Sequence, residues 1–250
     1  MRLPAAPARR SVAGSGNPIA ETVGLVARDW QNSRMMTLPI AAVLIACLTL
    51  AGLLGIAEYR SSARWRWLFK PATSILFVIA GLGRAPAGPY DWLVIAGLSL
   101  SFIGDVALIP PGDGWFLAGL VAFLGAHIAY AAAFLTSGGV LLPNPLAAGL
   151  GITAAAGFIG YFRPHLGRMF WPVIAYVGAI TLMIVAAWSL GDRVSAATAS
   201  RAALGASLFY LSDLAVARDR FLSGTGYPNR AIGLALYYGG QFLLAFSIHA

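Results

Sequence analysis

The chain has 250 residues, of which 59% are hydrophobic and only 10% are charged, and its formal net charge is +8. Soluble globular proteins carry about 25% charged residues, so this composition excludes a soluble domain and indicates an integral membrane protein. The positive charge gathers beside apolar runs, where it sets membrane orientation and meets anionic lipid, so no nucleic-acid partner is expected. The single cysteine, Cys47, excludes an intramolecular disulfide and a cysteine-based zinc site.

The first part of the chain differs in composition from the rest. Residues 1–35 are rich in Ala, Arg, Gly, Ser and Pro and contain no apolar core of the kind that a cleavable signal peptide needs. We expect a disordered basic tail over residues 1–35 and a transmembrane helical domain over residues 36–250.

Apolar runs of about 17–25 residues predict transmembrane helices. Short stretches rich in Pro, Gly and Asn, such as residues 85–89 and 110–114, separate them. The expected fold is therefore all-α, a polytopic transmembrane helix bundle of about eight spans. The expected spans cover residues 38–57, 69–83, 92–109, 115–135, 145–162, 170–190, 201–217 and 231–249.

The basic residues predict an orientation. In an eight-span chain, the loops after spans one, three, five and seven share one membrane face, and short basic loops favour the cytoplasm. The arginines of the N-terminal tail favour the opposite orientation. We expect a multi-pass protein of the bacterial inner (cell) membrane with the first set of loops in the cytoplasm. That set holds Arg60, Arg64, Arg66, Lys70, Arg163, Arg168, Arg218, Arg220 and Arg230.

Two aspartates, Asp105 and Asp213, each stand alone in an otherwise apolar run. A carboxylate inside a membrane helix costs a few kcal/mol, so it normally faces a polar interior and marks a pathway or a reaction site. Both lie about one turn from the C-terminal end of spans that run in the same direction. At about 1.5 Å per residue, both carboxylates should lie roughly 6–8 Å inside the same face.

Other polar residues are expected near the two carboxylates. Span two begins at the same face with Lys70, span eight enters there, and span four places His127 deeper with Tyr130 one turn later. Helical spacing of four residues puts Gly97 and Ser101 on the face of Asp105, and Gly205 and Phe209 on the face of Asp213. The expected pocket collects Lys70, Asp105, Ser212, Asp213, Tyr238 and Gln241, with His127 below them.

Each of these residues also has a structural explanation. Either aspartate alone could hydrogen-bond between helices, Lys70 could extend to the headgroups, and the tyrosines of span eight could belong to an interfacial belt. His127 is more typical of an interior histidine with satisfied hydrogen bonds than of a metal ligand. We expect no metal site and no cofactor.

Six segments follow one another in a recognisable order, namely Lys70-Pro71, GLSLSFIGD (97–105), FLAGLVAFLGAHIAYAAAF (116–134), PVIAYVGAITLM (172–183), GASLFYLSDLAVARDRF (205–221) and LYYGGQFLLAF (236–246). Together, over about residues 69–249, they resemble the YhhN-like lysoplasmalogenase family of multispan membrane proteins. The resemblance implies hydrolysis of the vinyl ether bond of a lysoplasmalogen, which yields a fatty aldehyde and a glycerophospho-ethanolamine or -choline.

The resemblance implies that Asp105 and Asp213 are the catalytic residues, and Lys70, His127 and Gln241 match further family positions. We expect these three, with Tyr130, Ser212 and Tyr238, to bind substrate. Vinyl ether hydrolysis needs one carboxylic acid that keeps its proton and one carboxylate, as glycosidases do by chemical analogy. Which aspartate plays which part is open at this point.

Other functions remain open from the residues alone. Intramembrane carboxylates also relay protons in proton-coupled transporters. His127 and the aspartates could instead bind zinc in a metal-dependent intramembrane lipid hydrolase. A non-catalytic scaffold would leave the two aspartates unexplained. The expected partners are a lysophospholipid substrate and membrane lipid, while the substrate's headgroup and the oligomeric state are open.

Overall fold

The computed structural model describes residues 42, 45–47, 49–60, 62–137, 143–191, 194–222 and 224–248. The chain divides into two compact units, Met1–Ala42 and Val43–Ala250, and the second unit carries all the helices discussed below. The tail expected over residues 1–35 lies outside the described residues. The prediction of an all-α fold is confirmed, because no strand occurs among the residues described.

The helices follow one another through short connections. An apolar helix, Ile45–Tyr59, comes first. The remaining helices are α2 (Ala63–Leu82), α3 (Pro89–Ala107), α4 (Asp113–Thr136), α5 (Pro145–Leu166), the 3-10 turn η1 (Gly167–Met169), α6 (Phe170–Trp188), α7 (Ala196–Phe221) and α8 (Gly226–Phe246).

Three of these helices begin five or six residues earlier in the chain than the apolar runs predict. The structure starts α2 at Ala63, α7 at Ala196 and α8 at Gly226. Hydropathy marks only the part of a helix that lies among apolar surroundings, whereas backbone hydrogen bonding continues through polar turns such as the one containing Arg64 and Arg66. Flanking residues such as Arg64, Arg66 and Arg230 are therefore helical rather than in loops.

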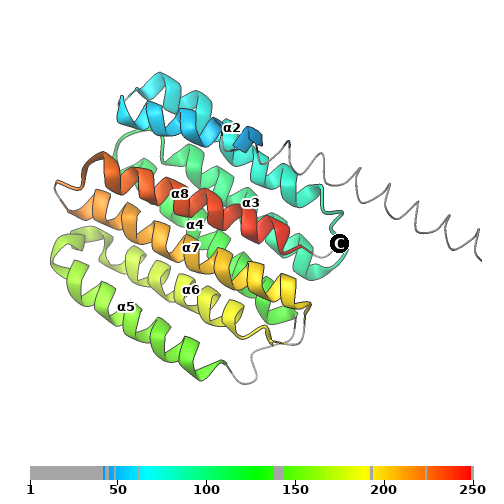
Figure 1. Ribbon diagram of the computed structural model, residues 1–250. Helices are drawn as coiled ribbons and strands as arrows, with labels where there is room; N and C mark the ends of the chain where they lie inside the picture. Colours follow the sequence, from blue (N-terminus) through cyan, green and yellow to red (C-terminus); the bar gives the residue numbers. More distant parts are fainter. Residues whose placement is uncertain are drawn as a thin grey trace, which may run out of the picture. The chain divides into compact units, whose positions relative to one another are not determined.

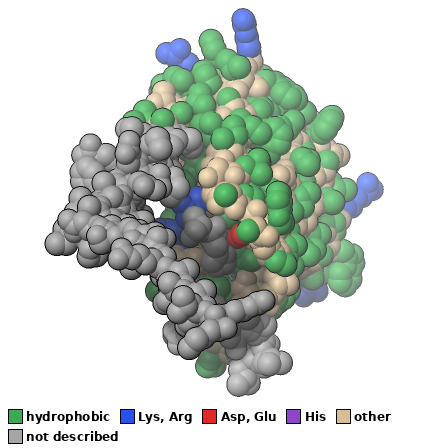
Figure 2. All heavy atoms as spheres, turned by 90° about the vertical axis from the view of Figure 1, so that its right-hand side faces the viewer, with side chains coloured by type: hydrophobic (Ala, Val, Ile, Leu, Met, Phe, Trp, Pro, Cys, Tyr) green, Lys and Arg blue, Asp and Glu red, His purple; other side chains and the backbone are tan. Residues whose placement is uncertain are grey.

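The chain is an integral membrane protein. Among the described residues, three helical runs are long and apolar enough to cross a bilayer, namely Pro89–Ala107, Asp113–Thr136 and Pro145–Trp188, the last of which joins α5, η1 and α6. Large apolar side chains such as Ile103, Ile128 and Leu182 are about half exposed, as lipid-facing positions are. Figure 2 shows hydrophobic side chains over much of the visible face.

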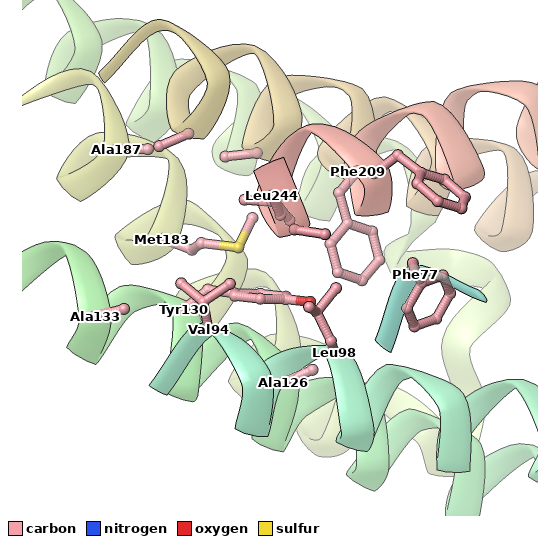
Figure 3. Packing of buried hydrophobic residues seen from close by; sticks show 14 of the residues in the cluster. Phe77, Val94, Leu98, Ala126, Tyr130, Ala133, Met183, Ala187, Phe209 and Leu244 are labelled. Atoms are coloured by element: carbon pink, nitrogen blue, oxygen red, sulfur yellow. The ribbon is translucent and has the colours of Figure 1, made fainter. Parts of the chain in front are cut away.

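The helices of the second unit pack side by side (Figure 1). The most extensive contacts join α7 to α8 and α3 to α4, while α2 packs on α3 and α8, and α5 packs mainly on α6. Buried apolar residues from α2, α3, α4, α6, α7 and α8 meet in one core (Figure 3), including Phe77, Leu98, Tyr130, Met183, Phe209 and Leu244.

Glycines allow two close approaches within this core. A Cβ at Gly205 of α7 would lie 3.0 Å from the carbonyl oxygen of Gly240, and a Cβ at Gly240 of α8 would lie 2.9 Å from that of Gly205. A methyl at Gly97 of α3 would overlap the ring of Tyr130. Small residues let membrane helices approach closely, and here they bring together the helices that carry the polar residues.

Candidate functional site

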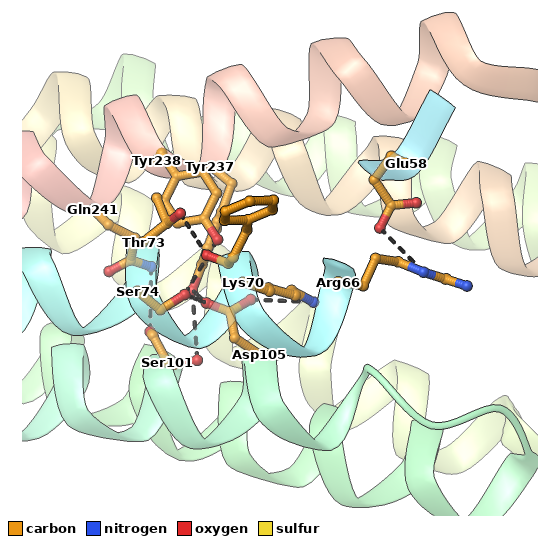
Figure 4. A network of polar contacts seen from close by, with 11 residues as sticks. Glu58, Arg66, Lys70, Thr73, Ser74, Ser101, Asp105, Tyr237, Tyr238 and Gln241 are labelled. Atoms are coloured by element: carbon orange, nitrogen blue, oxygen red, sulfur yellow. Dashed lines mark hydrogen bonds and ion pairs between the residues drawn. The ribbon is translucent and has the colours of Figure 1, made fainter. Parts of the chain in front are cut away.

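Asp105 lies near the C-terminal end of α3, buried with 2% of the residue exposed. Its Oδ2 accepts hydrogen bonds from Ser74 Oγ at 2.7 Å and from Tyr237 Oη at 2.6 Å. Lys70 Nζ lies 3.4 Å from Oδ1 (Figure 4). Two hydroxyl donors and an ammonium group therefore surround this carboxyl, and all of these interactions favour the ionised form.

A second set of hydrogen bonds extends this network away from Asp105. Tyr130 Oη of α4 donates to Gln241 Oε1 of α8 at 2.7 Å, and Gln241 Nε2 donates to Ser101 Oγ of α3 at 3.2 Å. The hydroxyl groups of Tyr238 and Ser74 lie 3.2 Å apart. Buried polar groups need partners, and this network satisfies them while fixing α2, α3, α4 and α8 relative to Asp105 (Figure 4).

Asp213 of α7 has different neighbours. Tyr176 Oη of α6 donates to Asp213 Oδ2 at 2.6 Å, and His127 Nε2 of α4 lies 3.4 Å from the same oxygen. The imidazole is fully buried, and its Nδ1 donates to the carbonyl oxygen of Phe123 at 2.6 Å. Its ring stacks on Phe209, with 4.5 Å between centroids. No lysine or arginine forms an ion pair with Asp213 among the residues described.

Aromatic side chains connect the two carboxyl groups. The rings of Phe123, Phe209 and Tyr237 contact one another with centroids 5.5–6.0 Å apart. Tyr237 binds Asp105 through its hydroxyl, whereas Phe209 contacts the imidazole beside Asp213. Each carboxyl therefore has its own set of hydrogen-bond partners, and an aromatic cluster lies where the two sets meet.

Asp105 and Asp213 both line one cavity of about 450 Å³. This volume is in the range of small-molecule binding sites. Charged residues line one part of it, among them Glu58, Arg66 and Lys70. Apolar residues from α4, α5, α6 and α7 line another part, including Leu120, Phe158, Val173, Val177 and Phe221. The cavity is thus amphiphilic, with both carboxyl groups in its wall.

Ion pairs join the helix ends around the charged part. Glu58 lies 3.9 Å from both Arg66 and Arg230, and Arg230 also pairs with Asp219 at 3.1 Å. Arg220 of α7 pairs with Asp113 at the start of α4. These contacts gather basic residues that follow spans one and seven at one face of the bundle. The Nε atom of Arg66 is buried without a hydrogen-bond partner in the described part of the chain.

The predicted site residues fall into two groups. Lys70, Asp105, Ser212 and Asp213 line the cavity, although the Ser212 hydroxyl donates to the carbonyl oxygen of Phe209 at 2.7 Å. The other four are buried in the hydrogen-bond networks rather than among the lining residues, and they are His127, Tyr130, Tyr238 and Gln241. Catalysis by the two aspartates and binding of substrate by the other six residues stay predictions.

Three residues that contact the carboxyl groups or their partners were not expected from the sequence. Ser74 follows Lys70 by four residues, so helical spacing puts both on one face of α2. Tyr176 lies within an apolar span, where a hydroxyl group is a detectable signal. Tyr237 is not in the expected pocket, and a place in an interfacial belt was one explanation for it, yet it is buried and donates to Asp105.

A metal site built from His127 and the aspartates is one alternative that the sequence leaves open. Among the described residues, no group of three or more His, Cys, Asp or Glu side chains is placed to hold an ion. His127 and Asp213 meet without a third such residue, and Asp105 is paired with Lys70.

Comparison with known proteins gives a consistent assignment. The model of the YhhN family matches residues 65–248, which include α3 to α8 and nearly all of α2. The chain is 35% identical over 178 residues to a protein of Bos taurus named lysoplasmalogenase TMEM86A, covering 69% of this chain and 72% of that protein.

Two bacterial relatives extend the comparison. A Mycobacterium bovis protein named lysoplasmalogenase is 31% identical over 188 residues, covering 73% of this chain and 68% of that protein. An Escherichia coli O157:H7 protein named uncharacterized membrane protein YhhN is 28% identical over 193 residues, covering 77% of this chain and 91% of that protein. No solved structure matches the chain. The chain belongs to the YhhN family.

Proposed function

We propose that the protein is a lysoplasmalogenase, an ether hydrolase that cleaves the vinyl ether bond of an alkenyl lysophospholipid. The observation that carries this proposal is the pair Asp105 and Asp213, which line one amphiphilic cavity but have different partners. The names of the Bos taurus and Mycobacterium bovis relatives point to the same reaction. The expected products are a fatty aldehyde and a glycerophospho-ethanolamine or -choline.

The cavity has the polarity of such a substrate. A lysolipid has a charged headgroup, a glycerol backbone and one long chain. We place the phosphate beside Arg66, whose buried Nε makes no hydrogen bond in the described part of the chain and lies 3.9 Å from Glu58, and beside the ammonium group of Lys70. The fatty chain of the lipid lies against the apolar wall of α4, α5 and α6, which includes Phe158 and Val177. The vinyl ether then lies in the cavity that both carboxyl groups line.

The chemistry needs both groups in different protonation states. Protonation of the vinyl carbon distal to oxygen gives an oxocarbenium ion, water adds to the carbon attached to oxygen, and the hemiacetal collapses to aldehyde and alcohol. A carboxylic acid supplies the proton, and a carboxylate stabilises the cation and activates the water. Both functions are available in this cavity without a nucleophilic residue or a covalent intermediate.

The test is an aldehyde-release assay with the full-length protein in detergent. The substrates are three lysophospholipids with the same headgroup and chain length, which differ in an alkenyl, alkyl or acyl linkage. We expect long-chain aldehyde only from the alkenyl lipid. Release of fatty acid from the acyl lipid without aldehyde from the alkenyl lipid contradicts the proposal and favours a hydrolase of another class.

Two further arms of this assay address the alternatives. Activity that EDTA abolishes and zinc restores would identify a metal-dependent lipid hydrolase. Proton uptake into proteoliposomes with no lipid cleavage would identify a proton-coupled transporter. We also propose the cell membrane, in bacteria the inner membrane, as the location; fractionation of cells that produce the native protein tests this.

A further inference from the structure

We propose that Asp213 is the proton donor of this reaction, with His127 as the positioning residue that holds its proton, and that Asp105 is the group that is ionised when substrate binds. This inference rests on the proposed function and goes beyond it, because it assigns opposite parts to the two carboxyl groups. Three independent features of the structure support it.

The first feature is the geometry of His127. Its Nδ1 faces the carbonyl oxygen of Phe123 at 2.6 Å, and a carbonyl only accepts, so Nδ1 carries a hydrogen. In the neutral imidazole Nε2 then carries only a lone pair, and it faces Asp213 Oδ2 at 3.4 Å. A lone pair on Nε2 that faces an ionised Oδ2 with no hydrogen between them is unfavourable, because Nε2 is buried without a hydrogen-bond partner among the described residues, while Oδ2 already accepts from Tyr176. One proton therefore lies between Asp213 and His127.

The same arrangement makes His127 dependent on Asp213. Nε2 is buried and makes no hydrogen bond in the part of the chain that the structure describes. Asp213 Oδ2, at 3.4 Å, is therefore the group with which it can share a proton. Stacking on Phe209 and an edge contact with Tyr176, at 4.5 and 4.9 Å between centroids, hold the ring in this orientation. The imidazole thus fixes the position of the proton while lying behind the cavity wall.

The second feature is the charge balance at Asp105. Lys70 lies 3.4 Å from one oxygen, and Ser74 and Tyr237 donate to the other. An ammonium and two hydroxyl donors are complementary to a carboxylate and leave a carboxylic acid hydrogen without an acceptor. Asp213 has one hydroxyl donor, Tyr176, and an imidazole instead of a lysine. The two environments therefore suit opposite protonation states.

The third feature is the direction in which an amphiphile fits the cavity. Asp105 is paired with Lys70, which contributes to the charged part, whereas Asp213 accepts a hydrogen bond from Tyr176 of α6, the helix that also contributes Val173 and Val177 to the cavity lining. In a vinyl ether the carbon that receives the proton is on the fatty-chain side, and the ether oxygen is on the headgroup side. A substrate bound with its headgroup at Lys70 therefore presents the distal vinyl carbon to Asp213.

The step balances in atoms and charge. The acidic hydrogen of Asp213 forms a C–H bond with the distal vinyl carbon, and the two π electrons make that bond. The adjacent carbon becomes the oxocarbenium centre beside Asp105, and Asp213 is left ionised, with a hydrogen bond from Tyr176. Water adds to the cation and loses one proton to Asp105. When the hemiacetal collapses, its hydroxyl proton returns to the Asp213–His127 pair, and the proton on Asp105 goes to the departing glycerol oxygen.

Hydrogen exchange tests the assignment directly. Alkenyl lysolipid is incubated in D2O with Asp105→Asn or with Asp213→Asn, and recovered substrate is analysed by mass spectrometry. We expect Asp105→Asn to incorporate deuterium at the distal vinyl carbon, because the donor is intact and the trapped cation returns to alkene. Asp213→Asn should incorporate none. Deuterium with Asp213→Asn, or none with either variant, overturns the assignment.

A second experiment tests His127 without removing a carboxyl group. His127→Gln keeps an amide near Asp213 but cannot hold a transferable proton, so kcat should fall about 10- to 100-fold. KM should stay within about twofold and the solvent deuterium isotope effect on kcat should rise, because proton transfer becomes more strongly rate-limiting. His165→Gln, an exposed control near the end of α5, should match the wild type.

These outcomes separate this inference from the proposed function. A wild-type protein that releases no aldehyde refutes the function itself. An active wild type with an unchanged isotope effect in His127→Gln refutes only the part assigned to His127. Elution as a single species and helical circular dichroism show whether each variant is folded, and Asp213→Glu provides a second variant that keeps the acid, for which we expect residual turnover with deuterium incorporation into the aldehyde.

Discussion

Tyr237 of α8 donates its hydroxyl hydrogen to Asp105 of α3 at 2.6 Å. The ring of the same tyrosine contacts Phe209 of α7, which stacks on His127 beside Asp213. Tyr237 therefore bonds to Asp105 and also contacts Phe209, the ring that stacks on the imidazole of His127. Changes at Tyr237 should affect the reaction, although its hydroxyl binds only Asp105 and a backbone carbonyl among the described residues.

Substitution of either aspartate by asparagine should lower kcat by about 10²- to 10⁴-fold, because each variant removes a proton-transfer group while keeping its size. The measurement is aldehyde release from alkenyl lysolipid. Asp113→Asn is the matched control, since the Asp113 side chain is 81% exposed and an exposed ion pair contributes little. Activity in either Asp105→Asn or Asp213→Asn within tenfold of wild type would remove the two-carboxyl mechanism.

Tyr237→Phe and Tyr238→Phe make a second matched pair. The first removes a hydrogen bond to a charged group, worth about 1.5–3 kcal/mol, so kcat should fall roughly 10- to 100-fold. Tyr238→Phe removes a contact to Ser74, one step further from Asp105, and should cost less than tenfold. Steady-state kinetics of both variants distinguishes these roles; an equal loss in both would mean that the hydroxyl on Asp105 has no special part.

The Lys70–Asp105 pair should show strong coupling in a double-mutant cycle. Lys70→Met leaves a buried carboxylate without its counter-charge, so the thermal unfolding midpoint in detergent should drop. The double variant Lys70→Met/Asp105→Asn removes both charges and should recover much of that loss. Additive shifts in the midpoint would show that the two groups do not form a functional ion pair in the membrane protein.

Arg66→Gln should affect substrate binding more than chemistry. Its Nε is buried at the charged part of the cavity and lies 3.9 Å from Glu58, but it makes no hydrogen bond among the described residues, so its hydrogen is available to a phosphate oxygen. We expect KM for the alkenyl lysolipid to rise about tenfold and kcat to change little, since uniform binding is lost. Arg64→Gln is the control because Arg64 is exposed and absent from the cavity lining. A fall in kcat at constant KM contradicts this role.

Much of this site was accessible from the sequence because carboxylates are rare inside membrane helices. Asp105 and Asp213 stood out for that reason, and regular spacing placed Gly97 and Ser101 on the face of Asp105, where the structure puts the Tyr130 ring and Gln241. The expectation that both aspartates face one cavity agrees with the structure. Their catalytic roles stay predictions.

The rest could not be predicted because lipid-facing and interior side chains in a membrane protein are both apolar. Hydropathy therefore does not reveal which side of α6 turns inward, and Tyr176 could be assigned to Asp213 only once the helices were placed. The same limit applies to Ser74, since serine is common on any face of a membrane helix. His127 was visible, but which group its Nε2 faces depends on how α4 and α7 pack.

The close approach of the Gly205 and Gly240 backbones bears on how constant the separation of Asp213 and Tyr237 is. Asp213 lies two turns beyond Gly205 on α7, and Tyr237 lies about one turn before Gly240 on α8. Main-chain atoms, which cannot rotate out of the way, thus set the separation of these two side chains. Swelling or thinning of the surrounding bilayer can tilt the helix pair as a whole, yet it leaves the spacing between the acid and the tyrosine unchanged.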